Sequence, residues 1–100
     1  MNDLHAWLSE QHHGLRTFQT FQHKLETLGR RDPAQRGLCR LLSGIVGSYV
    51  EAFDEAPLPV EVAEGAYRRL LTLVEGLDLQ GDAARRLADI NRVATCELWQ

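Results

Sequence analysis

The fold class is clearest in residues 33–54, which read PAQRGLCRLLSGIVGSYVEAFD. Large apolar side chains recur there at spacings of three and four residues, so they cover about half the circumference of a helix with 3.6 residues per turn. These side chains are Leu38, Leu41, Leu42, Ile45, Val46, Tyr49, Val50 and Phe53. Asp32 precedes Pro33 as a helix N-cap, with proline at the first helical position. The stretch therefore predicts a helix, and we expect it to be the most buried one.

Three more helices are predicted on either side of this stretch. Their apolar residues show helical spacing over residues 3–29, 59–77 and 82–98. Pro57 and Pro59 mark one turn, and Gly81 marks another, followed by Asp82 as a cap. Short connections make successive helices antiparallel. We therefore expect an all-α fold, a small four-helix up-down bundle in a single domain over residues 1–100.

The first predicted helix is too long for such a bundle. It would extend about 40 Å at 1.5 Å per residue, whereas the third and fourth would reach only about 25 to 28 Å. One interpretation is a break at Gly14, because glycine costs about 1 kcal/mol in a helix interior. The other is an overhang in which Leu4, Trp7 and Leu8 form an exposed apolar patch, which is unusual for a monomer. We favour the overhang, and with it a homodimer whose first helices contribute to the interface.

Charge is distributed unevenly along the chain. The formal net charge of −3 disfavours nucleic-acid binding, which draws affinity from basic side chains that neutralise phosphates. Arginines nevertheless gather at one predicted end of the bundle, namely Arg30, Arg31, Arg36 and Arg40, which Arg85 and Arg86 would join. Acidic residues gather at the other end, namely Glu51, Asp54, Glu55, Glu61 and Glu64. Either this is a solvated, partly self-paired surface, or it recognises a polar partner surface.

Catalytic and metal-binding patterns are missing from the sequence. The two cysteines form no C-x-x-C pair, and the four histidines lack two ligands at helical spacing on one face. There is no nucleophile elbow and no glycine-rich phosphate loop. Ser43, Gly44, Gly47 and Ser48 lie within a predicted helix, where they would allow close helix approach in the core or across a subunit interface. We expect no enzyme, no cofactor and no metal.

The C-terminal segment carries a second candidate contact. Cys96 and Trp99 fall outside the main apolar arc of the last predicted helix. Trp99 either folds back as a lid on the core or anchors a partner, because tryptophan is enriched at interfaces.

These patterns together favour a protein-binding function. No apolar run is long enough to span a membrane and no secretory signal is seen, so we expect a small cytoplasmic, bacterial protein. It would act as an adaptor, chaperone or inhibitor that occludes or scaffolds another protein. The candidate contact residues are Leu4, Trp7, Leu8, Arg36, Arg40, Arg85, Arg86, Cys96 and Trp99. One alternative is a bundle that holds a small ligand or metal with Tyr49, Tyr67 and the histidines, and a third is nucleic-acid binding through the arginine-rich end.

Overall fold

A computed structural model describes residues 3–99, and every regular element in that range is helical. The elements are α1 (Asp3–Ser9), α2 (Leu15–Arg31), a 3-10 turn η1 (Pro33–Gln35), α3 (Arg36–Phe53), α4 (Val60–Glu75) and α5 (Ala83–Ala94). The all-α class is confirmed. The four-helix bundle is not, because residues 3–99 form five α-helices. None of these helices combines the length and the apolar character needed to cross a membrane.

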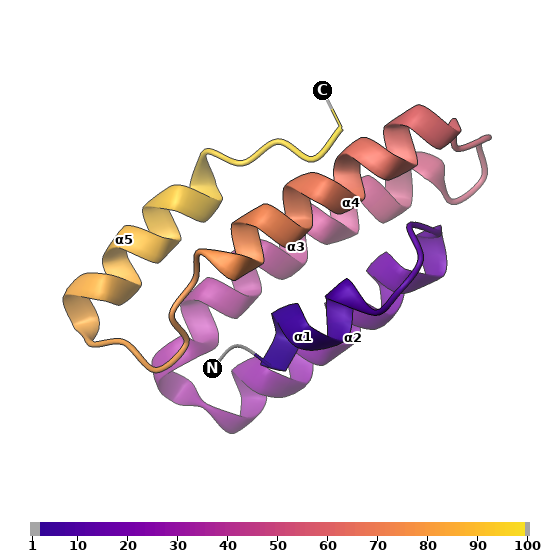
Figure 1. The fold of residues 1–100 in the computed structure, drawn as a ribbon. Coiled ribbons are helices and arrows are strands. Elements are labelled where there is room, and N and C mark those ends of the chain that lie inside the picture. The colour runs from indigo at the N-terminus through magenta and orange to yellow at the C-terminus, as the bar shows by residue number, and fades with distance from the viewer. Residues whose placement is uncertain (1–2, 100) are drawn as a thin grey trace.

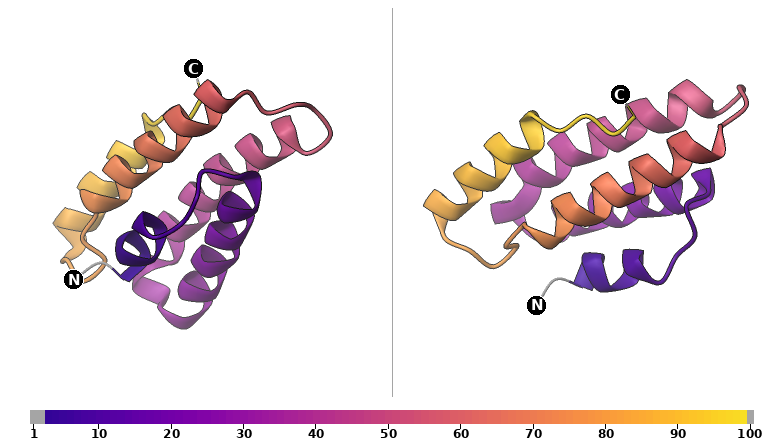
Figure 2. Two further views of the ribbon diagram at one scale, coloured as in Figure 1. Left: turned by 45° about the vertical axis from the view of Figure 1, so that its right-hand side comes forward. Right: turned by 45° about the horizontal axis from the view of Figure 1, so that its top comes forward.

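The helices lie in two groups around the core. In one group, α3 lies between α2 and α5 and contacts both. In the other group, the short α1 packs against α4 and also contacts α2 (Figures 1 and 2). α2, α3 and α4 bury five residues each. The expectation that α3 is the most buried helix is therefore wrong. The reason lies in its outer face, where glycine, serine and charged residues meet solvent instead of another helix.

The predicted first helix is two helices. α1 ends at Ser9 and α2 begins at Leu15, with Gly14 in an extended conformation at the N-cap (φ −71°, ψ 159°). α1 folds back over α2 and α4 (Figure 2). The break at Gly14 is thus confirmed, and the predicted overhang is wrong. The same fold-back removes Leu8 from the candidate contact residues, since its side chain is 0% exposed in the core.

Tyr67 in α4 holds the folded-back α1 in place through hydrogen bonds to residues at and just after its end. Its hydroxyl donates to the carbonyl oxygens of Leu8 and Gln11, 2.6 and 2.9 Å away, sharing one proton between them. The last carbonyls of a helix have no partner within that helix. The Leu8 carbonyl also accepts the backbone N–H of Gln11 at 3.0 Å, so the Tyr67 hydroxyl is a second donor there and ties the end of α1 to α4.

Aromatic packing holds the C-terminal segment. The ring of Trp99 lies 5.5 Å from that of Tyr49 and 6.5 Å from that of Phe53, between centroids, and Leu98 beside it is 1% exposed. Of the two interpretations of Trp99, the structure shows the lid on the core. The Tyr49 hydroxyl beneath it is buried and forms no hydrogen bond within residues 3–99.

Candidate functional site

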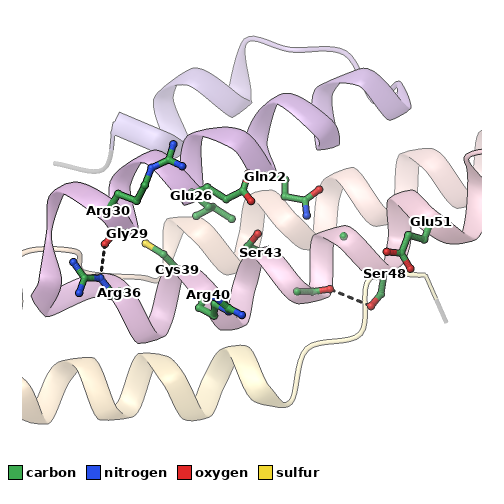
Figure 3. A pocket seen from close by; sticks show the side chains of 13 residues that line it. Gln22, Glu26, Gly29, Arg30, Arg36, Cys39, Arg40, Ser43, Ser48 and Glu51 are labelled. Carbon is green, nitrogen blue, oxygen red and sulfur yellow. Dashed lines mark hydrogen bonds between the residues drawn. The ribbon is translucent and has the colours of Figure 1, made fainter.

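The outer face of α3 is partly uncovered, with Arg40, Gly44 and Ser48 exposed. A groove of about 590 Å³ runs along it between α2 and α3 (Figure 3). We call it the α2–α3 groove. Its side from α2 carries Gln22, Glu26 and Arg30, and its side from α3 carries Arg36, Arg40, Ser43, Gly44, Gly47, Ser48 and Glu51.

The glycines of this region differ in what they accommodate. A Cβ on Gly29 would lie 3.2 Å from the Cβ of Cys39, so glycine at this position lets α2 and α3 approach closely. A Cβ on Gly47 would meet the Gln22 side chain. At Gly44, in contrast, no atom lies within 4 Å of an added Cβ. Glycine costs about 1 kcal/mol in a helix interior, and the packing of residues 3–99 does not require it at position 44.

Opposite charges occupy the two ends of the groove. Arg30, Arg36 and Arg40 lie towards the start of α3, with Glu26 of α2 next to Arg30, and Glu51 lies near the end of α3 (Figure 3). The Arg36 Nε donates to the carbonyl oxygen of Gly29 at 3.0 Å, which fixes that side chain at the basic end. Neither Arg40 nor Glu51 forms an ion pair with another side chain within residues 3–99. Both side chains are also exposed, so both charges are available to a molecule that enters the groove.

Two of the predicted arginines serve the fold. Arg85 Nε donates to Asp89 Oδ1 at 3.0 Å, and the other carboxylate oxygen accepts the backbone N–H of Asp78 at 2.9 Å. Arg86 Nε donates to Gln35 Oε1 at 3.2 Å, and the buried Gln35 amide donates in turn to the carbonyl oxygen of Leu79. Arg85 and Arg86 thus tie the α4–α5 connection to the start of α5 and to η1. The expectation that they join Arg36 and Arg40 in one contact surface is not supported by this geometry.

The remaining predicted contact residues lie elsewhere. Leu4 and Trp7 are half-buried on α1, where the Lys24 Nζ lies 4.9 Å from the centroid of the Trp7 ring. Cys96 and Trp99 are half-buried on the C-terminal segment. Of the candidate residues, only Arg36 and Arg40 line the α2–α3 groove. Ser43, Gly44, Gly47 and Ser48, which the sequence pattern marked as sites of close helix approach, also line the groove. The pattern did not show whether they face inwards or outwards.

Three of the polar groups considered for a ligand or metal, Tyr67, His5 and His13, contact other parts of the chain. The Tyr67 hydroxyl holds α1, and His5 and His13 lie 3.4 and 3.9 Å from Glu75 and Glu64. Within residues 3–99, no group of three or more His, Cys, Asp or Glu side chains is placed to hold a metal ion.

Cys39 lies at the base of the groove with a suppressed thiol acidity. It is 2% exposed, and burial, assisted by the negative charge of Asp32, raises its pKa from 9.0 to about 11. A thiolate is the nucleophilic form of cysteine. Burial thus keeps Cys39 a neutral thiol near neutral pH, and its side chain lies next to Gly29 where α2 and α3 meet.

The Cys39 thiol makes stability depend on alkaline pH. Because its pKa is higher in the folded chain, its contribution is complete below about pH 9 and is lost as the pH rises towards about 11, where only the unfolded thiol ionises readily. We expect the difference in free energy of unfolding between the wild type and Cys39→Ala to shrink by on the order of 1–2 kcal/mol over this interval. Urea unfolding at a series of pH values measures it. A difference that stays constant or grows with pH would contradict the assignment.

No protein-family model, no curated protein and no solved structure matches the chain.

Proposed function

We propose that the chain is a cytoplasmic protein-binding module without catalytic activity, which docks a helix of a protein in the α2–α3 groove. The single observation that carries the proposal is Gly44, which lies in the middle of α3 and has open space above it, since an added Cβ would meet no atom within 4 Å. We call the α3 surface at Ser43, Gly44 and Gly47 the floor of the groove. Packed helices lie about 8–10 Å apart, depending on the side chains between them. A floor of glycine and serine permits the close end of that range.

The charges of the groove add orientation to this contact. A helix that carries acidic side chains at one end and basic side chains at the other would be attracted in one direction and repelled in the reverse one. Complementary charge of this kind sets register and partner choice more than raw affinity. The module would then act as an adaptor, chaperone or inhibitor, either by covering the surface of its partner or by holding that partner in place.

A photo-crosslinking residue at Ser48 in the native cell tests the proposal. Ser48 is exposed on the rim of the groove, so we expect covalent adducts with protein. Adding Gly44→Leu on the same chain should abolish these adducts, because a leucine side chain fills the floor. The matched control carries the same crosslinker at Arg68, which is exposed on α4. Absence of any adduct specific to Ser48, or adducts that persist with Gly44→Leu, would overturn the proposal.

A further inference from the structure

We propose that the occupant of the α2–α3 groove is a second copy of this chain, docked with its α3 antiparallel to the first. The inference rests on the proposed function, because it uses the same groove. It replaces the homodimer expected from the α1 region, where no overhang exists.

The charges along α3 are complementary to those of a second α3 that runs in the opposite direction. In an interface between two identical copies related by a two-fold axis, residue i of one copy meets residue j of the other, and j meets i. An antiparallel register that places Arg40 opposite Glu51 of the second copy also places Gly44 opposite Gly47. The same register places Arg36 opposite Glu55, which is exposed just beyond the end of α3.

A parallel arrangement gives the opposite electrostatics. It would bring Arg40 against Arg40 and Glu51 against Glu51, and like charges across an interface are unfavourable. The basic start and acidic end of α3 therefore select the antiparallel direction. By symmetry, each favourable pair occurs twice in the dimer.

The small residues of α3 favour an interface centred on the same Gly44–Gly47 region as the charge pairs do. The floor is open at Gly44, and an added Cβ at Gly37 likewise meets no atom within 4 Å. Two helices can thus approach closely at Gly44, with the charged pairs on either side. At Gly47 the flexible Gln22 side chain lies where a Cβ would be, so it has to rotate away before the second copy can contact Gly47. Because the facing side chains are small and polar, we expect a small interface and a weak dimer, with a dissociation constant on the order of micromolar.

Charge reversal with rescue tests the register. Sedimentation velocity of the full chain, over roughly 1 to 500 µM, should show dimer formation by mass action. Arg40→Glu and Glu51→Arg should each weaken the dimer at least about tenfold, because each single reversal creates two like-charged pairs. The double variant should restore it, since both pairs are again opposite in sign. Arg68→Glu on α4 is the matched control and should leave the dimer unchanged.

A second variant separates docking from folding. Gly44→Leu should abolish the dimer, whereas the circular dichroism and melting temperature of the monomer should be retained or increased, because leucine favours the helix and its Cβ meets no atom. Wild-type protein that remains monomeric throughout the concentration range would overturn the dimer while leaving crosslinks from Ser48 to other proteins in support of the proposed function. A dimer that ignores both the charge reversals and Gly44→Leu would overturn this register.

Discussion

Replacing Leu8 with alanine is expected to lower the free energy of unfolding by about 3–5 kcal/mol, the range for a fully buried leucine whose removal leaves a cavity. Leu8 lies in α1 and is 0% exposed. Had α1 extended away from the core, the same substitution would cost little. Chemical denaturation at one fixed protein concentration measures the change, since self-association would make stability depend on concentration.

The chain offers a matched control for this substitution. Leu87 in α5 is 61% exposed, so Leu87→Ala should change the free energy of unfolding by no more than about 0.5 kcal/mol. Equal effects at Leu8 and Leu87 would show that α1 is not docked on the core.

Replacing Asp89 with alanine is expected to cost about 2–4 kcal/mol, because it removes a buried carboxylate that pairs with Arg85 and accepts the partly buried backbone N–H of Asp78. Asp89 is 3% exposed and accepts hydrogen bonds from Arg85 Nε and Asp78 N. The Arg85 side chain is 45% exposed, which keeps the cost below that of a pair buried on both sides. Thermal and urea unfolding measure it.

A substitution of Asp82, which precedes α5, gives the cost of losing a hydrogen bond from an exposed carboxylate, for comparison with the buried carboxylate of Asp89. It is exposed, and its carboxylate accepts the backbone N–H of Arg85 at 2.9 Å as the N-cap of α5. Asp82→Ala should cost about 1 kcal/mol, the usual value of a cap. Asp89→Asn, which keeps one acceptor oxygen, should fall between the two. A smaller loss for Asp89→Ala than for Asp82→Ala would contradict the role assigned to the buried carboxylate.

The sequence predicted the helices well where local signals were strong. Asp32 with Pro33, the prolines at 57 and 59, and Asp82 are all at element boundaries, and the three later predicted helices contain α3, α4 and α5 within a few residues of each end, α3 being preceded by η1. Capping and turn preferences act over only a few residues, so they are readable without a structure.

The first 31 residues were harder to predict because their fold depends on distant contacts. Gly14 weakens a continuous helix by about 1 kcal/mol, which permits a break without dictating where the freed segment goes. That destination is set by a core position for Leu8 and by the Tyr67 hydroxyl, 59 residues away in sequence. The amphipathic pattern of residues 3–9 is the same whether its apolar side covers its own core or another chain.

The candidate site was visible in part for a related reason. Arg36 and Arg40 were identified from their clustering, and Arg85 and Arg86 from the same pattern, although neighbouring carbonyl and carboxylate groups engage the latter two. Glycine and serine carry no strong hydropathy, so periodicity does not assign Gly44 to the inside or the outside of a helix. Only the three-dimensional arrangement shows that Gly44 is exposed and that an added Cβ there would meet no atom within 4 Å.

The link between Tyr67 and α1 also bears on the order of folding. α2 and α3 are consecutive and joined by a short connection, so they can pair early with little loss of chain entropy. α1 cannot complete its docking until α4 is in place, because the Tyr67 hydroxyl that donates to the Leu8 and Gln11 carbonyls belongs to α4. α1 thus completes its docking after α4, and we expect its amide hydrogens to exchange with solvent in a partial opening that leaves the α2–α3 pair intact.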